Sequence, residues 1–190
     1  GRRSNYINRI NGIDSVVVNK DDRVQKFSGY KQWDIIQKLL FKQNEHISHL
    51  LNLQVSNTNN VPRYDRLQDV RNFGAPIGTT LRYAEWFYGP QKRILGAYQL
   101  NANNLGFADA LKLNINYQDI EESRKTREYR RYDSFDSQVE KVKVFGVSVT
   151  GRKDIRNSEL TAGVDAQFND VKSRATRTNL TTGAVAKLNS

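Results

Sequence analysis

The chain has 190 residues and a formal net charge of +10, from 30 Lys and Arg against 20 Asp and Glu. It contains no cysteine, which excludes disulfide frameworks, thiolate metal sites and cysteine nucleophiles. Its two histidines, His46 and His49, are too few for a histidine-rich metal centre, so we expect no metal and no cofactor. The positive charge favours anionic partners but does not choose among nucleic acid, lipid and acidic ligands.

Along the chain, apolar residues alternate with Asn, Gln, Lys and Ser at a period of two, which is typical of strands with one wet face. The clearest run is 111–118, LKLNINYQ. The pattern predicts six strands, near 27–43, 47–58, 92–103, 108–121, 140–151 and 158–170. Because tight turns join only antiparallel neighbours, we expect an all-β, antiparallel meander.

The predicted connections alternate between short and long. Short turns fall at 43–46, 104–107 and 152–157, and long connections at roughly 59–92 and 121–140. Alternating strands with unequal ends are the pattern of an outer-membrane barrel, whose periplasmic turns are short and extracellular loops long. Aromatic residues lie where the two interfaces would fall: Tyr30, Trp33, Phe41, Phe107, Tyr117 and Phe168. The alternative is a soluble β-rich binding module, which would show the same alternation.

A barrel predicts two opposite faces. The side chains expected to face lipid are Leu51, Leu53, Leu111, Leu113, Ile115, Val147, Val149, Val164 and Ala166. Those expected to face the lumen are Asn52, Gln54, Lys112, Asn114, Asn116, Asp165 and Gln167. Membrane barrels have at least about eight strands, so six strands indicate part of a larger barrel and a chain cut from a longer protein.

Three segments carry a family resemblance: VPRYDRL at 61–67, LRYAEWFYGPQKRILGAYQL at 81–100 and YQDIEESRKTREYRRYDSFDSQVEKVKVF at 117–145. They resemble the barrel of TonB-dependent outer-membrane receptors, in a branch associated with haem or other iron sources. The likeness extends from 28–43 to 163–171. It implies that the chain supplies about six strands of a barrel of about 22 strands, which encloses a plug domain that this chain lacks.

The resemblance also implies an organisation and a function. Residues 1–26 would form an extracellular loop or lead-in, 27–171 six barrel strands with three short periplasmic turns and long extracellular loops, and 172–190 an extracellular extension. The protein would import a scarce ligand, an iron complex such as haem or a siderophore, across the outer membrane of a Gram-negative bacterium. Its partners would be outer-membrane lipid, the plug and remaining strands, the iron complex, and the TonB energy-coupling complex through a segment not present here.

The loop 61–92 is the best candidate for ligand contact, because arginines attract anionic groups while aromatic rings stack on flat ligands. The candidate residues are Arg63, Tyr64, Arg82, Tyr83, Trp86 and Tyr88. The alternative for each is structural, since aromatic rings above a strand anchor the interface and Arg–carboxylate pairs hold loops together. His46 and His49 lie at or next to a short turn, at the end away from captured ligand.

The run RKTREYRR at 124–131 offers the nucleic-acid alternative, since bases with an aromatic ring can bind phosphates and stack on a base. Between Glu121 and Lys143, however, seven bases face six acids. This balance predicts a self-paired loop and no nucleic acid. Phosphate-binding loops and nucleophile elbows are absent from the sequence, so we expect no enzyme.

Overall fold

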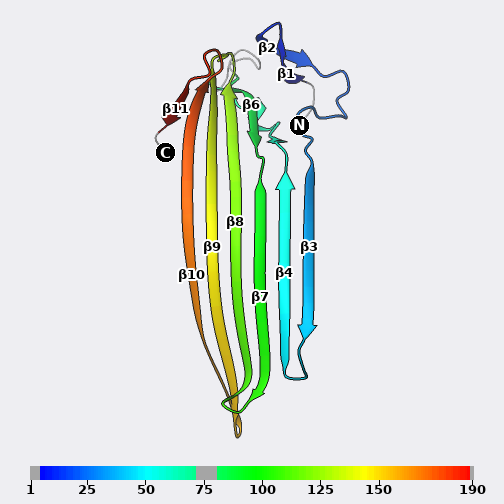
Figure 1. The fold of residues 1–190 in the computed structure, drawn as a ribbon. Coiled ribbons are helices and arrows are strands. Elements are labelled where there is room, and N and C mark those ends of the chain that lie inside the picture. The colour runs from blue at the N-terminus through cyan, green and yellow to red at the C-terminus, as the bar shows by residue number, and fades with distance from the viewer. Residues whose placement is uncertain (1–4, 72–80, 189–190) are drawn as a thin grey trace.

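The computed structural model describes residues 5–71 and 81–188, and these form β-structure apart from one 3₁₀ turn and the connections (Figure 1). A hairpin comes first, made of β1 (Asn5–Ile10) and β2 (Ile13–Val18). The six long strands are β3 (Gln32–Lys42), β4 (Ile47–Thr58), β7 (Lys92–Leu105), β8 (Ala108–Glu128), β9 (Ser134–Ile155) and β10 (Ser158–Asn179). The shorter elements are β5 (Val61–Pro62), η1 (Arg66–Gln68), β6 (Tyr83–Tyr88) and β11 (Val185–Leu188).

The long strands form a single antiparallel sheet in the order β11-β10-β9-β8-β7-β4-β3, with β5 and β6 paired beside this path. The predicted all-β class and antiparallel meander are therefore confirmed. Within residues 5–71 and 81–188 the sheet does not close on itself, because β3 and β11 are its two ends. In the same part of the chain, no helix is long and apolar enough to cross a membrane.

The two ends of the sheet differ, as the sequence predicts. The connections 43–46, 106–107 and 156–157 lie at the lower end in Figure 1, whereas β1, β2, β6 and β11 lie at the upper end. Local chemistry explains the first turn, where the side-chain oxygen of Asn44 accepts hydrogen bonds from the backbone N–H groups of His46 and Ile47, both at 2.8 Å. In the other two, Asn104 and Arg156 adopt positive φ angles of 59° and 52°.

The upper end differs from the prediction. The expected long connection 121–140 is reduced to 129–133, because β8 continues to Glu128 and β9 starts at Ser134. Likewise β10 runs to Asn179, well into the predicted extension 172–190, and β11 pairs with its end. Residues 5–18 form the hairpin where a loop or lead-in is expected. Within the predicted loop 61–92, β6 pairs with β8 beyond the end of β7; residues 72–80 lie outside the described residues.

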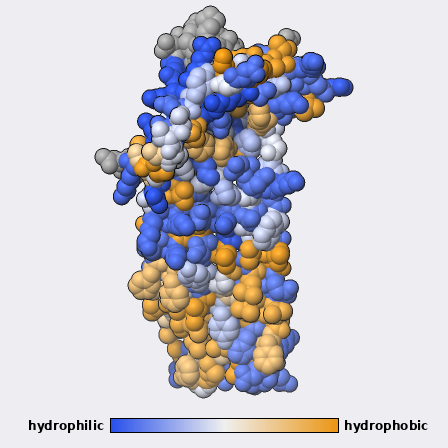
Figure 2. Space-filling view, turned by 45° about the horizontal axis from the view of Figure 1, so that its top comes forward, coloured by the Kyte–Doolittle hydropathy of each residue, from blue (hydrophilic) through white to orange (hydrophobic). Residues whose placement is uncertain are grey.

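The register of the sheet sorts side chains into the two predicted sets, since residues directly opposite each other share a face. One row of the apolar face contains Leu100, Leu113, Val149 and Val164. The neighbouring row of the polar face contains Gln99, Asn114, Ser148 and Asp165. Figure 2 shows apolar side chains gathered over the lower part of the molecule and hydrophilic ones over the upper part.

The apolar face ends abruptly toward the upper end. On β8, β9 and β10 its last row is Tyr117, Phe145 and Phe168, and the next row is Asp119, Lys143 and Asp170. On β3, β4 and β7 the row aligned with those charges is still apolar, with Ile35, Val55 and Ile94. The upper boundary of the apolar face therefore runs obliquely to the strands.

A small buried core lies at the upper end, where the hairpin, η1, β6 and the region just after β8 meet. Its members are Ile7, Leu67, Leu81, Ala84, Trp86 and Tyr129. The long strands contribute little to it, since β3 and most of β10 are exposed and the residues of β4, β7, β8 and β9 are mostly half-buried.

Candidate functional site

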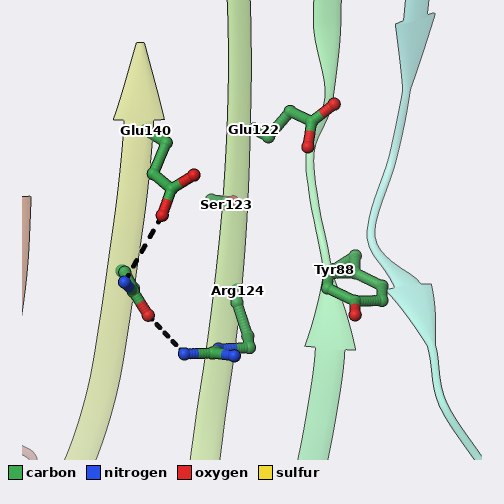
Figure 3. Close-up of a pocket in the computed structure, with 6 residues that line it drawn as sticks. Tyr88, Glu122, Ser123, Arg124 and Glu140 are labelled. Carbon is green, nitrogen blue, oxygen red and sulfur yellow. Dashed lines mark hydrogen bonds between the residues drawn. The ribbon is translucent and has the colours of Figure 1, made fainter. Parts of the chain in front are cut away.

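A groove lies on the polar face at the upper end, beside Tyr88 of β6 (Figure 3). One part, of about 260 Å³, is lined by Tyr88, Glu122, Ser123, Arg124, Gln138 and Glu140. A second part, of about 420 Å³, shares Tyr88, Glu122 and Ser123 and adds Tyr30, Gln32, Thr58, Val61, Gly89 and Gln91. We call the two parts together the Tyr88 groove. The register explains the grouping, because Tyr88 lies opposite Arg124 and Arg124 opposite Gln138.

Hydrogen bonds fix most of the polar groups that line this groove. Glu122 accepts hydrogen bonds from Arg93, at 2.8 Å, and from Gln91. Arg124 donates to Gln138, whose amide group in turn donates to Glu140 at 3.4 Å. The groove therefore presents hydroxyl, amide, carboxylate and guanidinium groups to a ligand, in an arrangement suited to recognising polar or charged groups.

The segment after β5 covers part of β6. The guanidinium of Arg63 lies over the rings of Trp86 and Tyr88, at 5.5 and 5.4 Å from their centroids. Those two rings meet edge to face with centroids 4.6 Å apart. Arg63 also forms a bidentate ion pair with Asp65, at 2.7 and 2.8 Å, and this hydrogen bonding lowers the pKa of Asp65. Arg63 is thus oriented by both an acid and two rings.

The six predicted ligand-contact residues divide into separate groups. Arg63, Trp86 and Tyr88 come together as described. Arg82 lies over the ring of Tyr83 at 5.1 Å, and the Tyr64 hydroxyl donates to the backbone oxygen of Asn5 at 3.0 Å.

Their exposure also differs. Trp86 is 6% exposed within the buried core, whereas Tyr88 is 43% exposed and lines the groove. Tyr88 is therefore the predicted residue best placed to meet a ligand.

A buried ion pair at the upper end is a feature that the sequence did not indicate. Asp14 of β2 accepts two hydrogen bonds from the Arg127 guanidinium, both at 2.8 Å, and one from the backbone N–H of Arg130 at 2.8 Å. The Asp14 and Arg127 side chains are 0% and 3% exposed. Burial acts to raise the pKa of Asp14, but the hydrogen bonds from Arg127 and Arg130 outweigh it and lower that pKa.

Arg127 belongs to the basic run 124–131, and three of the five bases in this run are bound to other side chains of the protein. Besides Asp14, its guanidinium contacts Glu85 at 2.7 Å. Arg131 pairs with Glu128 at 3.5 Å, and Arg124 is bound to Gln138.

The histidines lie at the lower end, as predicted. His49 contacts the Tyr98 hydroxyl at 2.7 Å and the side-chain oxygen of Gln43 at 3.1 Å. Its ring packs between those of Phe41 and Tyr98, with centroids 5.8 and 6.0 Å away. Among residues 5–71 and 81–188, no group of three or more His, Asp or Glu side chains is arranged to hold a metal ion.

The groove residues on β8 and β9 were missed because they fall in the segment predicted to be a loop. The residues at 121–125 are all polar, so no period-two signal marks the strand there. Comparison with models of protein families and with curated proteins finds no match to this chain. The faces of the sheet, the Tyr88 groove and the family resemblance are therefore the features that bear on function.

Proposed function

We propose that this chain forms part of the wall of a TonB-dependent outer-membrane receptor. In this proposal the protein binds a scarce ligand, an iron complex such as haem or a siderophore, and imports it into the periplasm of a Gram-negative bacterium. The outer-membrane part of the proposal is supported by the apolar face of the sheet. The receptor part is supported by the resemblance of 61–67, 81–100 and 117–145.

The exposed apolar band on one face of the sheet carries the proposal. Val164 and Phe168 are 74% and 66% exposed, and Leu53 is 44% exposed. Such a large exposed apolar surface requires a membrane or a partner to cover it. From Leu160 to Phe168 the band extends about 27 Å along β10, or about 20 Å of bilayer depth at a tilt of about 40°. Barrels in outer membranes have an apolar band of about 25 Å with aromatic borders.

The oblique boundary of the band supports the same arrangement. In a barrel the strands tilt relative to the membrane normal, so a flat membrane surface crosses neighbouring strands at different rows. Here the boundary lies above Phe168 on β10 and above Trp33 on β3, and these two residues belong to different rows.

On β7 to β10 the opposite face fits a wet interior, whereas on β3 and β4 it also carries Ile36, Leu40 and Leu50. Asn114, Ser148 and Asp165 share one row, and Asn52, Asn116 and Gln167 belong to the next. These side chains can hydrogen-bond to water or to a plug inside the barrel. The Tyr88 groove opens on this face, above the level of the apolar band. In the proposed receptor, an incoming ligand would first meet the wall at this level.

Cysteine labelling tests the membrane part, and the chain offers a clean background because it has no cysteine of its own. Leu113→Cys and Asn114→Cys are neighbours on opposite faces. With spin labels on the protein in bilayers, we expect oxygen dissolved in lipid to reach the label at 113. A water-soluble nickel reagent should reach the label at 114. Equal access of the nickel reagent to both labels would overturn the proposal and favour a soluble β-rich module.

Binding of haem and of ferric siderophores to variants tests the receptor part. We expect Tyr88→Ala to weaken binding of the transported ligand and to lower the free energy of unfolding by only about 0.5–1.5 kcal/mol, because the ring is 43% exposed on the groove and loses mainly its contact with Trp86. Trp86→Ala should instead lower the free energy of unfolding by about 3–5 kcal/mol, because Trp86 fills the core. If both Tyr88→Ala and Arg63→Ala bind both ligand classes as wild type does, the groove has no role in capture.

A further inference from the structure

Above the aromatic row, the apolar face of β7–β10 becomes basic. Over the two to three rows that follow, it carries five bases against the acids Asp119, Glu121 and Asp170. The bases, which we call the basic band, are Lys92, Lys141, Lys143, Lys172 and Arg174. At the same height the polar face carries Arg93 and Arg124 against Glu122 and Glu140, so its charges balance. The excess of positive charge is thus confined to one face of one sheet.

The register brings these bases together. Lys141 lies directly opposite Lys172 on the neighbouring strand, and like charges in that position repel each other. Glu121 contacts Lys141 at 2.8 Å, and Asp170 contacts Lys172 at 3.1 Å. Lys143 and Arg174 form no ion pair with the described residues. The available acids therefore leave the band with unneutralised cations.

We propose that the basic band binds the phosphate groups of anionic lipid headgroups in the leaflet next to the longer connections. This inference rests on the proposed function, since it requires the apolar band to lie in the bilayer. Aromatic girdles mark the interface of a membrane barrel, so residues just beyond them are at headgroup level. Arg174 can grip a phosphate through two N–H groups, and lysine ammonium groups bind it as point charges.

The distance between the aromatic row and the bases fits a lipid, which has apolar chains and a charged headgroup. Phe145 and Phe168 are 45% and 66% exposed and offer a surface for acyl chains. Lys143 follows about 7 Å farther along the strand and Lys141 about 13 Å farther, at two residues per row. One lipid can thus place its chains on the aromatic row and its phosphate on the bases. Free phosphate gains nothing from the aromatic row, and therefore we assign the band to lipid.

Lipid selectivity in bilayers provides the test. The protein is reconstituted with spin-labelled phosphatidylglycerol or phosphatidylcholine, and the fraction of immobilised lipid at the protein surface is measured. We expect a preference for phosphatidylglycerol of about threefold to tenfold, reduced by added salt. The triple variant Lys141→Gln, Lys172→Gln and Arg174→Gln should lose it.

A matched control removes the same charge from the polar face, as Lys38→Gln, Lys42→Gln and Lys112→Gln. It should keep the preference. The assignment to lipid would be overturned if the first triple variant kept the preference or if the control lost it equally. It would also be overturned if inorganic phosphate competed for the bases as well as phosphatidylglycerol does. The label at Leu113→Cys separates the two proposals. If oxygen still reaches this label but no lipid preference is found, only the lipid-binding proposal fails. If oxygen does not reach the label, the proposed membrane location fails as well.

Discussion

Replacing Asp14 with alanine should release the β1–β2 hairpin from the end of β8. The substitution leaves the Arg127 guanidinium, 3% exposed, without its bidentate partner. Removing one member of a buried ion pair costs about 3–5 kcal/mol, because the remaining charge stays buried. Arg127 keeps Glu85 at 2.7 Å, so we expect the lower end of this range, about 3 kcal/mol.

Amide hydrogen exchange measures this effect locally. A loss of about 3 kcal/mol corresponds to about 150-fold faster exchange through opening of the hairpin. Asp65→Ala is the matched control, since Asp65 forms an equally short bidentate pair with Arg63 but is 59% exposed. It should cost at most about 1 kcal/mol. Equal exchange in the two variants would refute the idea that the buried pair anchors the hairpin.

Three further outcomes follow from the geometry. Leu113→Arg should impair insertion and assembly in bilayers far more than Asn114→Arg, because a charged group facing the bilayer midplane costs about 2–4 kcal/mol. Gly163→Ala should lower the midpoint of thermal unfolding more than Gly146→Ala, since the added Cβ at 163 would meet a backbone carbonyl at 2.7 Å and at 146 a movable side chain at 2.6 Å. Because the pKa of Asp14 is lowered on folding, its contribution is complete above about pH 4, the ordinary aspartate range. The protection of the β1–β2 amides, measured by hydrogen exchange, should fall only as the pH drops further through that lowered pKa.

The strands and their faces could be predicted wherever the two faces of the sheet differ. Between Leu111 and Gln118 every second residue is apolar, and the structure keeps that alternation in register with β7 and β9. Beyond Asp119 both faces become polar, so the period-two signal disappears although the ladder continues to Glu128. The alternation in the sequence thus reflects the difference in polarity between the two faces. It disappears where both faces are polar.

The candidate site could be predicted only as far as local sequence reaches. The clustering of Arg63, Trp86 and Tyr88 follows from the aromatic and basic composition of one segment. The position of Tyr88 opposite Arg124 depends on strand pairing between distant parts of the chain, as does the ion pair between Asp14 and Arg127, which are 113 residues apart. Nonlocal pairs of this kind leave no periodic trace in the sequence.

The wall of the proposed receptor uses its two faces for different partners at almost the same height. Glu140 and Lys141 are neighbours in β9, yet Glu140 lines the Tyr88 groove and Lys141 belongs to the basic band. On the two proposals, Glu140→Gln should change the affinity for the transported iron complex and leave the lipid preference intact. Lys141→Gln should do the reverse. Because the two residues share one stretch of backbone, a variant that only disturbed the fold would change ligand affinity and lipid preference together. If each variant changes only one of the two, the two faces of the sheet must meet different surroundings.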